Sequence, residues 1–511
     1  MKPLTGIPLI LMTFALSLGT FMFVLDYSIA NVSIPYISGD VGVSNDQGTY
    51  VITSFAVGNA IALPMTGWLT KRIGAVKLMM LSLFLFVFFS WTCGASYNFG
   101  MLVVSRFLQG FCSGPMVPLS QSLLLMNHPP EKKNAAMAIW STIVIAAPVI
   151  GPMLGGWISY DYEWPWIFYI NIPVGLLSLT LVWLILKKRE TPIIKESLDV
   201  VGFIFLAFFV SALQILLDKG EQYDWFRSPW MRTFGITSFV SFTLLIVWSA
   251  TRPKPLIELQ LFKIRTYAIS ILYIAVAYGI YFGSVVLVPL WLQTNMNYTA
   301  IWAGIAVAPI GIVPLVFSMF IGKLINRFGI IPLLFVSFCL FAWSCFYTAF
   351  FDTDVTLFLI GLSRAFLGCG LFFFITPLFS LSVQDISQER LPSSTGVFHF
   401  VRAMVGGVGT SVFTTMWIRR TAYHHQTIGE NLTAFSPQTN SFLAQLSQLG
   451  LEGKKALAQM NDTLDVQSAM LAINDCFWVM GWTFLALLLF LPLGYKKREP
   501  HHKLPEHVSV E

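Results

Sequence analysis

Long runs of apolar residues recur along the whole chain, separated by short segments that hold most of the charges. A helix needs about 20 apolar residues to cross a lipid bilayer. Because the runs have this length, we predict a helical membrane protein. The predicted fourteen spans are residues 7–29, 50–70, 77–96, 100–125, 134–159, 165–187, 198–217, 231–250, 267–292, 300–325, 330–351, 355–382, 395–418 and 471–494.

The composition supports this class. Of the 511 residues, 56% are hydrophobic and only 11% are charged, which is more apolar surface than a water-soluble domain needs. The first run is too long for a cleaved secretion signal, and no small-residue cleavage site follows it. We therefore expect an all-α polytopic membrane protein that keeps its first run as a span.

The placement of Lys and Arg predicts the orientation. Most of the 31 basic residues fall on one side of the predicted spans, for example Lys71, Arg72, Lys132 and Lys133. Basic residues are enriched in cytoplasmic loops, so both termini are predicted to be cytoplasmic. The net charge of +6 is then mainly a topology signal and does not suggest a nucleic-acid partner.

The chain repeats itself weakly, because the segment from Gly67 to Gly74 reappears in similar form from Gly322 to Gly329. We interpret this as two six-helix bundles with two inserted helices, an architecture of transporters whose site lies between the halves. The predicted parts are the first bundle at 1–190, the inserted helices at 191–255, the second bundle at 256–418 and 471–498, an extracytoplasmic loop at 419–470 and a cytoplasmic tail at 499–511.

Asp26 lies inside the first apolar run, and we expect no second carboxylate inside a long apolar run. Burying a charge in lipid is costly, so an intramembrane acid is a functional-site hypothesis. The alternative is an acid near a helix end that interfacial water hydrates. Ile280 takes the corresponding place in the second half, so the acid belongs to the first half only.

Arg106 is a basic residue inside an apolar run. It is followed at four-residue spacing by Gly110, Gly114 and Pro118, so the four share one helix face. A membrane arginine must find a partner or water. It is either a charge partner or proton relay for the intramembrane carboxylate, or it is bonded to backbone carbonyls. We expect a structural role for its repeat copy, Arg364.

The segment Leu25–Pro35, which contains Asp26, Tyr27 and Asn31, resembles the signature of the EmrB/QacA-type drug:proton antiporters of the major facilitator superfamily. Family members have fourteen membrane helices, which agrees with the number predicted from the apolar runs. Phosphate-binding patterns of ATP-driven pumps are absent from the sequence.

Two further motifs carry the same resemblance. The loop with Gly67, Arg72 and Gly74 resembles the superfamily's conformational latch, although Lys71 stands where an acid is usual. Plain positive charge at a cytoplasmic loop is the alternative explanation. The other motif, which in the superfamily marks exporters rather than uptake symporters, consists of Gly151, Pro152, Gly155 and Gly156.

The resemblance implies a proton-coupled multidrug exporter, driven by the proton-motive force without a cofactor, and not an enzyme. Asp26 would hold either a proton or a cationic substrate, with Arg106 as its charge partner. Tyr27, Asn31 and Gln109 are expected in the substrate cavity. We expect no catalytic residue and no metal site.

The resemblance also implies a bacterial inner membrane, lipophilic drugs and protons as ligands, and a periplasmic adaptor (membrane fusion) protein with an outer-membrane channel. QacA-type members instead work as stand-alone pumps. The polar segment 419–470, with an amphipathic helix expected at about Ser441–Met460, is either a solvated loop or a docking surface, and it favours the tripartite form. A proton-coupled importer or exporter of one metabolite is the alternative function, and a non-transporting membrane scaffold is a third.

Overall fold

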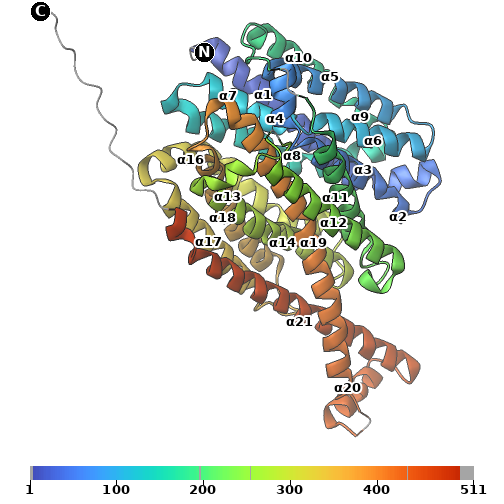
Figure 1. Cartoon of the computed structure of the whole chain (residues 1–511). Helices are drawn as coiled ribbons and strands as arrows, with labels where there is room; N and C mark the ends of the chain where they lie inside the picture. Colours follow the sequence, from blue (N-terminus) through green and yellow to red (C-terminus); the bar gives the residue numbers. More distant parts are fainter. Residues whose placement is uncertain (1–3, 195–196, 254, 434, 495–511) are drawn as a thin grey trace, which may run out of the picture.

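The computed structural model describes residues 4–194, 197–253, 255–433 and 435–494, and these contain helices and no strand. Figure 1 shows the helices gathered into one elongated bundle. The α-helices are α1 (Ile7–Val41), α2 (Asn45–Gly48), α3 (Tyr50–Ala62), α4 (Thr66–Ile73), α5 (Ala75–Gly94), α6 (Phe99–Ser113), α7 (Met116–Asn127), α8 (Lys133–Asp161), α9 (Trp166–Tyr169), α10 (Asn171–Leu186), α11 (Val200–Lys219), α12 (Pro229–Thr251), α13 (Arg265–Tyr273), α14 (Gly279–Thr294), α15 (Ala300–Val307), α16 (Pro309–Phe328), α17 (Ile330–Thr348), α18 (Leu357–Val383), α19 (Leu391–Gly429), α20 (Pro437–Gln448) and α21 (Lys454–Leu488).

The predicted class is confirmed. Among the described residues, 11 helices are long and apolar enough to cross a membrane, or 13 if each of two bent pairs is one span. The predicted helix at 100–125 is divided into α6 and α7 around Gly114 and Pro115. Large apolar side chains such as Phe84 and Phe358 are exposed on the outside of the helices, where a bilayer would cover them.

Three helices are much longer than predicted. α1 continues past Pro35 to Val41, while α19 and α21 extend far into the predicted loop at 419–470. Together with α20, the ends of α19 and α21 project beyond the bundle (Figure 1). The single amphipathic helix expected at about Ser441–Met460 is wrong, because Gly450 and Gly453 have φ of 80° and 58° and separate α20 from α21.

The expectation of one intramembrane carboxylate is also wrong. Asp218 lies in the last turn of α11, and Asp475 lies inside α21. Both helices are long and apolar enough to be spans. The apolar run that predicted α11 ends at Leu217, but the helix continues for two more residues to Lys219 and therefore includes the acid.

The weak repeat has a structural counterpart. Gly74 and Gly329 both have positive φ, 97° and 84°, at the turns after α4 and α16, a conformation that favours glycine. A Cβ on Gly67 would lie 2.7 Å from the Ser393 Cβ, and one on Gly322 would lie 3.0 Å from the Asn134 carbonyl oxygen. Each glycine therefore lets its helix pack against the first turn of a helix in the other half.

Hydrogen bonds between the two halves gather near these glycines. The Ser122 and Thr395 hydroxyls are 3.1 Å apart, and Asn134 Nδ2 donates to Asn326 Oδ1 at 2.7 Å. All four residues lie toward the end of the bundle that carries the loops after α4 and α16. The two halves are therefore joined at that end.

Candidate functional site

Asp26 of α1 and Arg106 of α6 form an ion pair in the interior of the protein. Arg106 Nη1 lies 2.6 Å from Asp26 Oδ2, and neither side chain has any solvent exposure. Removing two charges from water is costly, and a buried pair persists only with good geometry and further hydrogen bonds. The groups around the pair supply these bonds.

Two amides complete the coordination of the carboxylate. Asn171 Nδ2 donates to Asp26 Oδ1 at 2.6 Å, and Gln109 Nε2 donates to the same oxygen at 3.2 Å. Asn171 Nδ2 also lies 3.0 Å from the hydroxyl of Ser90 on α5. Asp26 thus accepts from three donors, an arrangement that suits an ionised carboxylate.

Arg106 is held from several sides. Its Nε donates to the Val51 carbonyl at 3.1 Å, and its Nη1 also donates to Gln109 Oε1 at 2.8 Å. The guanidinium carbon lies 4.2 Å from the centre of the Phe55 ring and 5.3 Å from that of Phe168. Aromatic faces attract cations, so both alternatives raised by the sequence apply: Arg106 is the charge partner of Asp26 and is also bonded to backbone.

A close contact between α3 and α6 positions the arginine. A Cβ on Gly110 would overlap the carbonyl oxygen of Phe55, and a Cβ on Gly58 would overlap that of Phe107. Glycines at these positions let the two backbones touch. This contact brings the Val51 carbonyl and the Phe55 ring to Arg106.

The structure separates the residues expected in the substrate cavity. Gln109 is fully buried inside the ion-pair cluster. Tyr27 is partly buried, with its ring centre 6.0 Å from that of Phe55. Asn31 is exposed and donates to the Tyr27 carbonyl at 3.2 Å, so it does not join Asp26.

The carboxylate of Asp26 lies among α5, α6 and α10, and the side chains that donate to it, Arg106, Gln109 and Asn171, all belong to the first six-helix group. Contact between Asp26 and a substrate stays a prediction. Asn171 and Ser90 were not anticipated as site residues. The available signal was weak: each is a polar residue inside or beside an apolar run.

The Asn171 donor leads to a prediction about stability and transport. The Asn171→Leu variant removes the hydrogen bond to the Asp26 carboxylate, and a bond of this kind contributes about 1.5–3 kcal/mol. The melting temperature in detergent and the transport rate should therefore both fall. Asn31→Leu is the control, because Asn31 donates to the Tyr27 carbonyl and not to Asp26. Equal melting temperatures and transport rates for wild type and Asn171→Leu would contradict this role.

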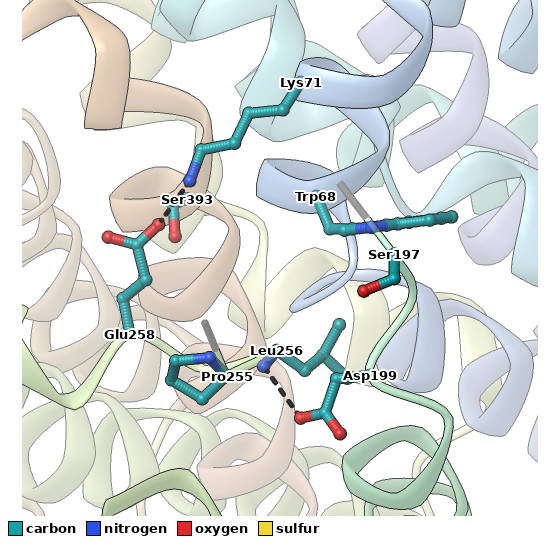
Figure 2. A pocket seen from close by; sticks show the side chains of 8 residues that line it. All are labelled: Trp68, Lys71, Ser197, Asp199, Pro255, Leu256, Glu258 and Ser393. Carbon is teal, nitrogen blue, oxygen red and sulfur yellow. Dashed lines mark hydrogen bonds and ion pairs between the residues drawn. The ribbon is translucent and has the colours of Figure 1, made fainter. Parts of the chain in front are cut away.

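In the latch-like loop, Lys71, which stands where the family has an acid, forms an ion pair with a carboxylate. Lys71, in the last turn of α4, lies 3.1 Å from Glu258 Oε1, and Arg390 Nε lies 3.7 Å from Glu258 Oε2. Figure 2 shows Lys71 extending toward Glu258, and both residues line the same small pocket. The lysine that departs from the family pattern therefore has an acidic partner just after the inserted helices.

Gly74 and Arg72 of the same loop have different surroundings. Gly74 sits against Glu190, whose carboxylate accepts from the backbone N–H groups of Val76 and Lys77 at 3.0 and 2.9 Å. This satisfies donors at the start of α5 that have no partner in the helix. Arg72 is exposed in the last turn of α4.

We predict that Lys71 and Glu258 are energetically coupled. Each side chain is partly exposed, 31% and 17%, so the pair is expected to contribute only about 1 kcal/mol. The double variant Lys71→Gln/Glu258→Gln should lose less thermal stability in detergent than the sum of the two single variants. Strict additivity would show that the contact contributes nothing.

The exporter-type motif packs on the helix that carries Asp26. A Cβ on Gly151 would lie 2.6 Å from Ser28 Oγ, and one on Gly155 would lie 2.8 Å from the Ile29 carbonyl oxygen. A Cβ on Gly156 would meet nothing within 4 Å. The side chain of Pro152 lies outside the described part of the structure.

Arg364, the repeat copy of Arg106, has a different environment. It is fully buried, and its Nη2 donates to the hydroxyls of Thr348 and Ser363 at 2.6 and 2.9 Å. Within the described ranges it forms no ion pair with a carboxylate, and Ile280, where the repeat would place an acid, is buried. The asymmetry predicted between the halves is therefore present.

Comparison with known proteins agrees with this architecture. The Major Facilitator Superfamily matches residues 16–410. The multidrug export protein EmrB of Haemophilus influenzae is 41% identical over 490 residues, covering 96% of each chain. The fatty acid resistance protein FarB of Neisseria gonorrhoeae is 39% identical over 500 residues, covering 98% of each chain.

A solved structure supports the fold alone. The proton:xylose symporter XylE bound to 6-bromo-6-deoxy-D-glucose has a TM-score of 0.61 at 13% identity, covering 94% of this chain and 95% of that chain. The described helices include enough apolar spans for a multi-pass membrane protein. The chain therefore belongs to the major facilitator superfamily and, within it, to the family of the EmrB multidrug export proteins.

Proposed function

We propose that the protein exports lipophilic and cationic compounds across the bacterial inner membrane in exchange for inward-moving protons. Its full-length similarity to multidrug export proteins supports the export of drugs. The observation that carries proton coupling is the fully buried Asp26–Arg106 pair, because an intramembrane acid with a charge partner is a common part of proton pathways. The proposal includes no enzymatic step and no cofactor.

Protonation of Asp26 would be the switching event. A proton on the carboxylate removes its charge and weakens the 2.6 Å contact to Arg106. Arg106 keeps its hydrogen bonds to the Val51 carbonyl and Gln109. Protonation would therefore mainly move α1, the helix that carries Asp26. Because α1 packs on Gly151 and Gly155 of α8, a shift of α1 would be passed to the helix with the exporter-type motif.

The same reasoning gives an orientation. If the basic loops are cytoplasmic, both termini are cytoplasmic, and the hydrogen bonds between the halves lie on the cytoplasmic side. In this proposal the conformation is closed toward the cytoplasm. Protons would then reach Asp26 from the outside once α1 moves.

The projecting helices α19, α20 and α21 support a partner outside the inner membrane. They extend beyond the bundle (Figure 1) and expose apolar side chains, with Phe435 at 94% and Leu449 at 76%. Exposed apolar residues in a projecting segment suit protein contact. We propose a periplasmic adaptor protein that leads to an outer-membrane channel; a stand-alone pump remains the alternative.

Inverted membrane vesicles test the proposed function. On acidification of the vesicle interior by the host's proton pumps, a cationic dye such as ethidium should accumulate inside, and an uncoupler should abolish its accumulation. Outward movement of the dye would favour an importer. Wild-type vesicles without any proton-dependent flux would contradict the proposal.

A further inference from the structure

Asp218 places a carboxylate where the two halves meet the first inserted helix. It lies in the last turn of α11, which contacts both α3 of the first half and α19 of the second. The Thr53 hydroxyl of α3 donates to Asp218 Oδ2, and the Ser411 hydroxyl of α19 donates to the neighbouring Leu217 carbonyl at 3.2 Å. The inserted helix therefore delivers an acid to the boundary between the halves.

Unlike Asp26, Asp218 is exposed. Its other oxygen accepts from Gln214 Nε2 at 2.9 Å, so the two side chains that donate to Asp218, Thr53 and Gln214, are both neutral. Within the described part of the chain, no basic side chain forms an ion pair with it. The adjacent Lys219 instead places its ammonium 4.9 Å from the centre of the Tyr50 ring. The negative charge of Asp218 is thus accessible and is not neutralised by a direct ion pair.

Aromatic residues from both halves lie in the same region. Helix α3, which bonds Asp218 through Thr53, also carries Phe55, whose ring centre lies 6.0 Å from that of Tyr27 in α1. On α19, a Cβ on Gly406 would lie 3.7 Å from the Tyr278 ring, and one on Gly407 would lie 3.8 Å from Oε1 of Gln214, the other partner of Asp218. A carboxylate together with aromatic rings is a combination that recognises organic cations.

One basic group borders the same region. The guanidinium carbon of Arg402 in α19 lies 5.7 Å from the centre of the Tyr278 ring. Arg402 therefore already places a positive charge on the Tyr278 ring, and we assign the attraction of a second cation to the carboxylate of Asp218.

We propose that Asp218 is the recognition carboxylate for the charged group of organic-cation substrates, with Tyr27 and Tyr278 as aromatic contacts. The inference rests on the proposed export function, and it assigns proton binding and substrate recognition to two different carboxylates. Asp26, sealed inside the first half, holds the proton. Asp218, exposed at the boundary, attracts the substrate. Tyr27 follows Asp26 directly in α1, so a substrate contact at Tyr27 would act on the helix that carries the proton-binding acid.

Ethidium binding to the purified full-length protein, followed by fluorescence, tests the proposal. Asp218→Asn keeps an oxygen acceptor for Thr53 but removes the charge, so it should weaken ethidium binding by about tenfold or more, equivalent to about 1.4 kcal/mol. Asp218→Glu should recover most of the affinity. Thr53→Val, which removes a hydrogen bond but keeps the charge, should change affinity by less than about threefold.

Asp224→Asn is the matched control, because Asp224 is exposed in the α11–α12 connection and pairs with Arg227 at the surface. It should bind ethidium like the wild type. Wild-type affinity in Asp218→Asn, with proton-driven ethidium export intact, would overturn the recognition role while the proposed function stands. A wild-type protein that neither binds nor exports ethidium would overturn both. Equal losses in Asp218→Asn and Thr53→Val would assign Asp218 a structural role and reject recognition.

Discussion

Replacing Asp26 with Asn is expected to reduce proton-driven export to background. The amide cannot exchange a proton, and it leaves the fully buried Arg106 without its counter-charge. Breaking one side of a buried pair costs about 3–5 kcal/mol of folding free energy. Export of ethidium from intact cells and the thermal stability of the purified protein measure the two effects separately.

A double variant separates coupling from folding. Asp26→Asn/Arg106→Gln removes both charges, so it should regain most of the thermal stability that the single variant loses. Proton-driven export should stay at background, because no carboxylate is left in the cluster to take up and release the proton. If export returned together with stability, Asp26 and Arg106 would be structural residues only.

Gly110→Ala is expected to cause the largest loss of stability among the glycine substitutions around the site. Its Cβ would overlap the carbonyl oxygen of Phe55 and lie 2.8 Å from the Phe55 carbonyl carbon. These are backbone atoms that cannot rotate away, so α3 must move as a unit. Overpacking of this kind costs about 1–3 kcal/mol or more. The melting temperature in detergent should fall, and transport should fall with it, since α3 positions the Val51 carbonyl for Arg106.

Gly100→Ala, in the same helix α6, is the matched control. A Cβ there meets only Asn98 Oδ1 at 3.5 Å, an ordinary contact, and melting temperature and transport should match the wild type. Equal behaviour of the two alanine variants would show that the close α3–α6 contact does not constrain the site.

The sequence was sufficient to predict the helical class and the two charges of the central pair. Asp26 and Arg106 are identifiable because charges inside apolar runs are rare and costly. Asn171 and Ser90 are not, because a single amide or hydroxyl in a span is ordinary, and its facing partner depends on how α5 and α10 pack against α1. Gln109 was assigned to a cavity for the same reason: periodicity alone does not say which neighbouring helix a side chain meets.

Helix ends and the connections between helices account for the other differences between the predicted and the observed structure. Asp218 was missed because the apolar run stops at Leu217, whereas backbone hydrogen bonding carries α11 to Lys219. Lys71 departs from the family's latch pattern, and its acidic partner Glu258 lies in a connection whose position the sequence does not reveal. Contacts made by connections depend on tertiary packing, which a one-dimensional pattern does not contain.

Substrate-linked proton movement in proteoliposomes tests the central role of Asp26 most directly. A pH-sensitive dye inside the vesicles reports proton movement. When ethidium is added to vesicles with the wild-type protein, protons should move in the direction opposite to the ethidium. The Asp26→Asn/Arg106→Gln variant should still exchange ethidium without a gradient but should move no protons in response. Substrate-linked proton movement of wild-type size in that variant would contradict Asp26 as the coupling acid.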